Sequence, residues 1–450
     1  MADRPDEVVA IASDLIRFDT TNRGGGDGRE RPAAEYVAGL LTEAGLDPVL
    51  LESAPGRANV VARVAGADPS RPALLVHGHL DVVPAEAARW SGDPFGGEVA
   101  DGVLTGRGAV DMKNAVAVTL ALVRNWARTG RRPDRELVLA FTADEEDTAA
   151  YGARWLVDKH ADLFQGCAEA IGESGGFTFH AEGRRLYPIA SAERGSAWLR
   201  LMARGTAGHG ARPSTDNAIV RLADAVTRIA GYRWPVRLIP AVRAAIEAIA
   251  AATGRPGPAT GETDVAAILA GLGPAGELVA GTLRNSANPT MLRAGQKVNV
   301  IPGEAVGYVD GRVLPGYQRE FEATLDELTG PAVDWEYAHS SPALQAPLDG
   351  PLVTAMSRAL LAEDPGGTVV PYCMSGGTDA KEFSRLGMAC YGFSPMVLPP
   401  GFDYYAMFHG VDERIPVSAL HSGVRIMDRL LAGGGRPSSA DRTGAAADSA

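Results

Sequence analysis

The 450-residue sequence has little cysteine: only Cys167, Cys373 and Cys390, which lie far apart in the chain. Three cysteines at these spacings fit neither a disulfide framework nor a cysteine-rich zinc module. The absence of a disulfide pattern favours a reducing compartment. We therefore expect a cytoplasmic protein.

Long apolar runs and an excess of positive charge are also missing. No uninterrupted apolar stretch approaches the ~20 residues needed to cross a bilayer. Residues 1–7 are charged, without the basic start and long apolar core of a signal peptide. Lys and Arg number 43 against 55 Asp and Glu, for a formal net charge of −12. This balance argues against a nucleic-acid or anionic-membrane partner.

The sequence does have enough apolar residues, 46% of the total, to form two or more domains with substantial cores. In the first half, apolar stretches such as 73–76 and 137–142 have the pattern of buried strands, and they alternate with amphipathic helical patterns such as 115–129. This alternation favours an α/β fold with a largely parallel or mixed sheet.

The pattern changes near Glu193. Residues 198–203 resemble an exposed edge strand, and 233–286, rich in Ala, Gly, Pro and Leu, are expected to be helical. Strands and helices without a βαβ rhythm indicate an inserted α+β domain. The predicted division is a catalytic domain in two segments, 1–192 and 347–433, interrupted by an insertion at 193–346 and followed by a disordered tail at 434–450.

Candidate metal ligands first occur where the apolar run 73–76 ends, in His77-Gly78-His79-Leu80-Asp81. Residues two apart in an extended backbone share a face, so His77, His79 and Asp81 can point the same way. An imidazole with a carboxylate beside it has the chemistry of a metal ligand with an orienting partner. From the spacing alone, both histidines are candidates.

Acidic residues follow the later strands or lie in the adjoining loops: Asp111, Glu145, Glu146 and Glu173. Ligands of open α/β sheets gather at the carboxyl ends of strands. One shared carboxylate, with a histidine and a further carboxylate for each ion, would make two three-ligand sites open to water, from His79, Asp111, Glu146, Glu173 and His409. Such ligands suit zinc, with manganese or cobalt as substitutes. Of two adjacent glutamates, one can bind metal while the other acts as a general base.

Three further features have an ordinary explanation beside a functional one. His209 lies in a glycine-rich stretch and fits a surface loop as well as a site. Arg312 could grip a substrate carboxylate with two hydrogen bonds, or form a surface salt bridge. The Gly376-Gly377-Thr378 turn offers backbone N–H groups to an anion, or simply begins a helix.

A series of motifs resembles one family in its order along residues 5–432. They are His79-Leu80-Asp81-Val82-Val83-Pro84, Gly106 to Lys113, Asp144-Glu145-Glu146, Gly172-Glu173, Gly208-His209, Asn299 to Glu304, Gly376 to Ala380 and His409 to Glu413. The family is that of the dinuclear zinc amidohydrolases, which includes aminoacylase, glutamate-releasing carboxypeptidases, acetylornithine deacetylase and succinyl-diaminopimelate desuccinylase.

The resemblance implies a role for each matching residue. His79, Asp111 and Glu173 would bind one zinc ion, and Asp111, Glu146 and His409 the other, so that Asp111 bridges. The roles implied outside the ligand set are orientation of His79 by Asp81, general-base catalysis by Glu145 on a metal-bridging hydroxide, oxyanion stabilisation by His209, and substrate binding by Asn299, Arg312, Gly376, Gly377 and Thr378. The peptide bond after Asp111 would be cis.

The resemblance also implies a fold and an activity. The fold would be a zinc-exopeptidase-like catalytic domain with a mixed twisted sheet, plus an inserted α+β lid domain through which a homodimer forms. The substrate would be a dipeptide or an N-acyl amino acid with a free carboxylate, and the cofactors two Zn²⁺ ions, with Mn²⁺ or Co²⁺ as alternatives. The alternatives are a carbamoyl-amino-acid hydrolase and a non-catalytic binding protein on the same fold.

Overall fold

The computed structural model describes residues 6–259 and 261–433, so the predicted tail at 434–450 lies outside the described residues. These residues form two compact units. The first unit comprises the chain up to Ile189, Asp349–Val369 and the residues from Glu382 onward, and the second comprises Ala190–Leu348 and Val370–Lys381. Residues 370–381, which the predicted division includes in 347–433, therefore cluster with the second unit.

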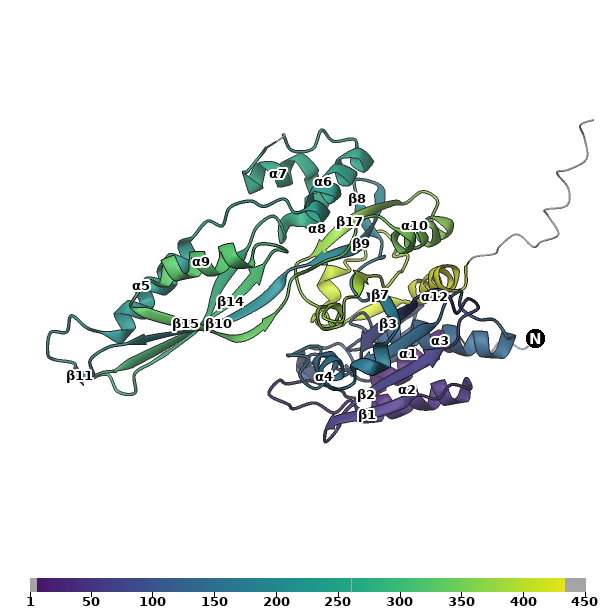
Figure 1. Ribbon diagram of the computed structural model, residues 1–450, viewed down its shortest axis with the longest axis horizontal. Coiled ribbons are helices and arrows are strands. Elements are labelled where there is room, and N and C mark those ends of the chain that lie inside the picture. Colours follow the sequence, from purple (N-terminus) through teal and green to yellow (C-terminus); the bar gives the residue numbers. More distant parts are fainter. Residues whose placement is uncertain (1–5, 260, 434–450) are drawn as a thin grey trace, which may run out of the picture. The chain divides into compact units, whose positions relative to one another are not determined.

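The first unit is built on a mixed sheet (Figure 1). Its strands are β1 (Val49–Ala54), β2 (Arg57–Val64), β3 (Ala73–His79), β6 (Leu137–Thr142), β7 (Cys167–Gly172), β8 (Phe179–Ala181), β9 (Arg184–Glu193) and β18 (Ala389–Gly392). The order is β1-β2-β6-β3-β7-β18-β9, with β8 paired to β9. Strand β9 continues into the second unit, where β16 (Leu344–Gln345) pairs with it. Strands β6, β3, β7 and β18 run parallel, whereas β1 and β2 are antiparallel additions. The predicted α/β class with a mixed sheet is confirmed.

Helices cover this sheet, and their apolar stripes determine which side faces inward. They are α1 (Glu7–Arg17), α2 (Arg31–Glu43), α3 (Lys113–Thr129), α4 (Ala153–Lys159), α10 (Pro351–Glu363), α11 (Ala380–Ser384) and α12 (Val417–Leu431). Helix α3 packs on β3 and contacts α1, α2 and α12. It ends at Gly130, whose φ of 70° is a left-handed conformation that glycine adopts without strain.

A small sheet in the same unit connects two distant loops. It has the order β19-β5-β4, formed by β4 (Glu98–Ala100), β5 (Val103–Thr105) and β19 (Arg414–Pro416). Pairing of Arg414 with Thr105 brings the residues before β19 beside those after β5. These residues include His409 and Asp111, so this sheet helps to build the site described below.

The second unit contains a four-stranded antiparallel sheet of order β12-β14-β10-β15. Its elements are β10 (Gly195–Arg204), β11 (Gly208–His209), α5 (Ala218–Gly231), α6 (Pro240–Thr253), α7 (Val265–Leu272), α8 (Glu277–Ala280), β12 (Ser286–Ala294), β13 (Val300–Ile301), β14 (Glu304–Val313), α9 (Gln318–Thr329), β15 (Val333–Ser341), β16 (Leu344–Gln345) and β17 (Thr368–Met374), which begins in the first unit. Its core joins Leu199 and Leu201 of β10 to Leu222 of α5 and Phe321 of α9.

One expectation for this unit was wrong. Residues 198–203 were expected to be an exposed edge strand, but β10 lies inside the sheet between β14 and β15. The alternating burial along β10 is correct for a strand with one covered face. The alternation shows which face of a strand is buried. It does not show whether the strand lies at the edge of the sheet, because that depends on pairing with distant strands. The helices expected within 233–286 are present as α6, α7 and α8.

Within the described residues, no helix combines the length and the apolar character that a membrane span requires.

Candidate active site

Three neighbouring parallel strands deliver the central side chains of the site. His79 is the last residue of β3, Glu145 and Glu146 follow β6, and Glu173 follows β7. Because β3 pairs in parallel with both β6 and β7, their carboxyl ends meet at one edge of the sheet. The structure thus brings together these predicted residues.

Asp111 lies between two imidazoles. Its Oδ1 is 3.0 Å from His79 Nε2, and its Oδ2 is 3.3 Å from His409 Nε2. Glu146 Oε2 is 3.1 Å from the same nitrogen of His409. One carboxylate with a separate oxygen toward each histidine has the form that a bridging ligand of two cations requires. The peptide bond between Asp111 and Met112 is cis, as the resemblance implied.

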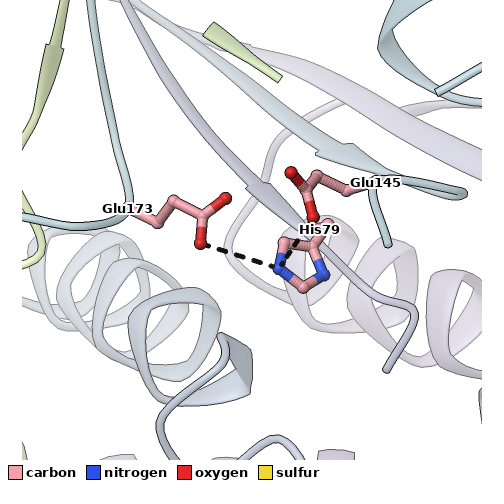
Figure 2. A group of neighbouring side chains, drawn as sticks. All are labelled: His79, Glu145 and Glu173. Carbon is pink, nitrogen blue, oxygen red and sulfur yellow. Dashed lines mark ion pairs between the residues drawn. The ribbon is translucent and has the colours of Figure 1, made fainter. Parts of the chain in front are cut away.

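Glu145 and Glu173 approach His79 from two sides (Figure 2). Each has a carboxylate oxygen 3.9 Å from His79 Nε2. Two sets of ligand atoms, those of His79, Glu145 and Glu173 and those of His79, Asp111 and Glu146, each lie within 4.8 Å of one another. Both glutamates of the Glu145–Glu146 pair therefore face the cluster.

The protonation of these side chains reflects the crowding of negative charge. Burial and the charge of Asp111 raise the pKa of Glu146 to about 7. Hydrogen bonds with Asp111 and Glu146 raise the pKa of His409 to about 10. Burial disfavours charge on Asp111, but hydrogen bonds with His409 and His79 hold its pKa below the usual range. In the protein without bound cations, protons on the imidazoles thus balance the negative charge of the carboxylates.

A metal cation fits this set of residues. Glu146 Oε1 is buried and has no hydrogen-bond partner in the part of the chain that the structure describes, although buried carboxylate oxygens normally have one. Carboxylates and imidazoles are the ligands of zinc and related divalent ions. A cation would satisfy this oxygen and displace the balancing protons, as metal binding does at such sites.

Asp81 holds the Glu145–Glu146 pair through the backbone. Its two carboxylate oxygens accept the N–H groups of Glu145 and Glu146, both at 3.1 Å. His79 Nδ1 is 2.9 Å from the backbone oxygen of Asp81 and 3.6 Å from its carboxylate. The nearer oxygen is the better hydrogen-bond acceptor. Asp81 thus contacts His79 mainly through its main chain, and its side chain orients the two glutamates.

His77 has a packing environment and is absent from both sets of ligand atoms. It is buried with its ring against Phe383, and a Cβ on Gly172 would come within 2.3 Å of that ring. Burial lowers the pKa of His77 to about 3, so the imidazole is neutral. Of the two histidines that the spacing left open, His79 is the one in the cluster.

Comparison with known proteins identifies the family. The model of peptidase family M20/M25/M40 matches residues 75–433. The chain belongs to this family. It is accordingly a hydrolase of a metal-dependent family, and the family resemblance seen in the sequence motifs is confirmed.

Individual proteins match over half or more of the chain. Human aminoacylase-1 is 28% identical, with 89% of each chain covered. Succinyl-diaminopimelate desuccinylase of Cereibacter sphaeroides is 35% identical over 51% of this chain and 57% of that protein. The M20 metallo-carboxypeptidase Sso-CP2 of Sulfolobus solfataricus has the same fold, with a TM-score of 0.69 at 16% identity, covering 95% of this chain and 99% of that one.

The remaining predicted M20 site residues lie in the second unit. His209 in β11 pairs with Val300, and the next residue, Gly210, donates its N–H to the Asn299 carbonyl, so His209 and Asn299 are neighbours. Arg312 in β14 makes two hydrogen bonds to Asp310 and one to the Ser196 hydroxyl.

The Gly376-Gly377-Thr378 turn is also held within the second unit. The Thr378 N–H and hydroxyl both donate to the buried carboxylate of Glu193, at 3.1 and 2.7 Å. A side chain on Gly377 would collide with Lys381. The Thr378 amide is therefore already used inside the protein, and a role in substrate binding stays a prediction for this turn.

Glu413 is a site residue that sequence reasoning missed. Its buried carboxylate accepts the N–H groups of Gly108, Val110 and Asp111, at 2.7 to 3.0 Å, and pairs with Arg107 at 2.9 Å. It thereby fixes the loop that carries Asp111 to the loop that carries His409. Its place four residues after His409, in an acidic motif, was the available signal.

Substitution of Glu413 by Gln is expected to weaken metal binding about 10- to 100-fold, the usual effect of losing a group that orients a ligand. The amide has one acceptor oxygen in place of the two that Glu413 uses, and it offers no charge to Arg107. Zinc affinity should be measured by competition with a chromogenic chelator, since this measurement does not depend on turnover.

Asp412→Asn is the matched control for Glu413→Gln. Asp412 is the adjacent acid, but it contacts Ser91 rather than the Asp111 loop. The zinc affinity of the Asp412→Asn variant should equal that of the wild-type protein. Equal affinities in both variants would contradict the positioning of Asp111 by Glu413.

Proposed function

We propose that this chain is a dinuclear zinc amidohydrolase, which cleaves the amide bond of a dipeptide or N-acyl amino acid that carries a free carboxylate. The observation that carries the proposal is the placement of Asp111 between His79 and His409. His79, Asp111 and Glu173 would hold one ion, and Asp111, Glu146 and His409 the other. The chemistry that these ions supply when bound is Lewis-acid polarisation of the amide carbonyl and a lowered pKa of the attacking water.

Glu145 is the proposed general base. It faces His79 without being needed in either proposed three-ligand set, and Asp81 holds its backbone. As water attacks the amide carbon, Glu145 accepts its proton and later transfers that proton to the amine nitrogen as the carbon–nitrogen bond breaks. The second proton of the water also passes to the amine, so the products are a carboxylate and an ammonium group.

The proposal assigns the second unit a role in binding. His209 would stabilise the oxyanion of the tetrahedral intermediate, and Asn299 and Arg312 would contact the substrate. Human aminoacylase-1, which is similar over 89% of each chain, supports an N-acyl amino acid as substrate. A cytoplasmic location and a homodimer formed through the second unit stay predictions.

Metal removal tests the proposal directly. After dialysis against a chelator, hydrolysis is expected to fall at least about 100-fold, because the amide carbonyl loses its polarising ions. Addition of zinc should restore the rate at about two ions per chain, one for each proposed three-ligand set. The measurement is turnover of matched panels of dipeptides, N-acetyl amino acids and N-carbamoyl amino acids.

Two outcomes of this panel would redirect the proposal. Full activity in the metal-free protein would exclude a metal-dependent mechanism. Hydrolysis confined to the N-carbamoyl compounds would identify a carbamoyl-amino-acid hydrolase instead.

A further inference from the structure

Asn22 is a buried amide beside the acidic turn at residues 144–147 of the first unit. Only 4% of its surface is exposed. Its Oδ1 accepts the Gly24 N–H at 2.9 Å, and this bond identifies the other terminal atom as the NH2 group. The nitrogen donates to Asp81 Oδ2 at 2.9 Å and to Asp144 Oδ1 at 3.0 Å. Both hydrogens of the amide group are therefore used on carboxylates.

The main chain around Asn22 fixes this amide to the segment that carries Asp81. The Asn22 N–H donates to the Val82 carbonyl at 2.9 Å, and the Val82 N–H donates to the Thr20 carbonyl at 3.2 Å. The Thr20 hydroxyl donates to the Leu80 carbonyl at 2.6 Å. The place of the Asn22 side chain beside Asp81 is thus set by backbone hydrogen bonds on both sides.

The two carboxylates that Asn22 contacts hold the acidic turn from two sides. Asp144 begins the turn with a φ of 64°, a left-handed conformation that needs support in a residue with a side chain. Asp81 accepts the N–H groups of Glu145 and Glu146. Because both carboxylates are fully buried, each needs hydrogen-bond donors in place of water. The shared amide of Asn22 supplies one donor to each and adds no charge.

The direction of the Glu145 side chain depends on the backbone of this turn. Its carboxylate lies 3.9 Å from His79 Nε2, within the cluster (Figure 2). Asn22 itself belongs to neither set of ligand atoms. We propose that Asn22 is a positioning residue: it fixes the turn through these two carboxylates and thereby directs Glu145 into the cluster. This proposal rests on the proposed role of Glu145 as general base.

The kinetic test compares Asn22→Ala with the wild type, using full-length, zinc-loaded protein and the best substrate of the panel. The rate constant kcat is expected to fall about 10- to 100-fold, because a small displacement of a reacting group has an effect of this size. KM should stay within about three-fold of the wild-type value, since a general base acts on the chemical step rather than on substrate binding. An unchanged kcat would overturn the proposal.

A double-mutant cycle with Glu145→Gln shows whether Asn22 acts through the base. In the Glu145→Gln background no base is left to position, so Asn22→Ala should lower kcat by less than about two-fold further. A further loss of about 10- to 100-fold in the double variant would overturn the proposal. Such additivity would mean that Asn22 supports activity independently of Glu145.

Two further variants separate positioning from general stability. Ser13→Ala removes another buried hydrogen bond of the first unit, from the Ser13 hydroxyl to the Gly97 carbonyl at 2.6 Å. It should lower the midpoint of denaturant unfolding, as Asn22→Ala does, but leave kcat within about two-fold of wild type. Asn22→Ser keeps one donor, so its kcat should lie between those of wild type and Asn22→Ala, and the same cycle applies to it if the alanine variant does not fold. Equal losses of kcat in Ser13→Ala and Asn22→Ala would contradict the proposal.

Amide hydrogen exchange measures the turn itself and does not depend on turnover. In Asn22→Ala, a peptide that contains the Glu145 and Glu146 N–H groups should exchange about 10-fold faster, because the Asp81 carboxylate that accepts them is no longer fixed. Ser13→Ala should leave this exchange unchanged. Faster exchange in a protein that hydrolyses no panel substrate would reject the amidohydrolase and retain the role of Asn22. Hydrolysis with kcat and exchange independent of Asn22 would reject that role and retain the amidohydrolase.

Discussion

Glu145→Gln is expected to lower kcat about 1,000-fold or more while the protein keeps its metal ions. The amide side chain cannot accept the proton of the attacking water, and general-base catalysis contributes about 100- to 10,000-fold. Zinc content should stay at the wild-type level because neither proposed three-ligand set includes Glu145. The rate should be measured with the best substrate of the panel, and zinc by elemental analysis of the same sample.

Asp147→Asn is the matched control for Glu145→Gln. Asp147 belongs to the same acidic turn, but its carboxylate accepts the Gly25 N–H away from the cluster. Its kcat should stay within about three-fold of wild type, as expected for a surface change. If Glu145→Gln lost zinc together with activity, Glu145 would be a ligand rather than the base. Near-normal turnover would remove it from the mechanism altogether.

Arg57→Met is expected to destabilise the folded protein by about 3–5 kcal/mol, the cost of leaving buried charges without their partner. Arg57 is fully buried, and its guanidinium contacts Glu30 at 2.8 and 2.9 Å and Asp144 at 2.8 Å. The amide of Asn22 donates to both Asp144 and Asp81, and Asp81 holds the Glu145–Glu146 pair. Denaturant unfolding of the full chain should show the loss.

The loss caused by Arg57→Met should depend on pH. Burial and the charge of Asp81 raise the pKa of Glu30 to about 7 even with Arg57 present, and removal of Arg57 raises it further. A raised folded-state pKa favours the folded state below the unfolded value near 4.5, and this advantage is lost as pH rises through the folded value. The destabilisation is therefore smaller at pH 5 than at pH 8.

Arg63→Met, in the same strand β2, is the control for Arg57→Met. Arg63 makes a partly exposed ion pair with Glu136 at 3.0 Å, and such pairs contribute about 0–1 kcal/mol. Its effect should be small at either pH. Equal stabilities for the two variants would show that the buried network is not needed for folding.

Local sequence patterns predicted much of the secondary structure. The strand at 137–142 has the predicted limits, and the helix predicted at 115–129 is α3, Lys113–Thr129, because apolar periodicity and flanking turn residues are local signals. The strand β12, Ser286–Ala294, was not predicted: five consecutive residues at its end are exposed, so its pattern lacks a buried face. Its hydrogen bonds to β14 make it a strand.

The sequence likewise predicted part of the candidate site, and the structure supplied the rest. The motifs indicated His79, Asp111, Glu146, Glu173 and His409. His79, Glu146 and Glu173 also end or follow apolar strands, where polar groups stand out in a sequence. Asp81 was indicated too, as the residue that orients His79, but its carboxylate also accepts the Glu145 and Glu146 amides. Backbone hydrogen bonds carry no signature in side-chain type, so spacing cannot assign them.

Residue order thus established the family, the α/β class and the chemical nature of the site. Which buried charges pair with one another depended on the fold, because the partners are far apart in the chain. Glu413 meets the Asp111 amide 302 residues away, and Arg57 meets Asp144 across 87. Whether a buried charge is satisfied is set by the groups that packing brings within about 3 Å. The tertiary structure alone shows that Arg57 has two carboxylate partners, Glu30 and Asp144.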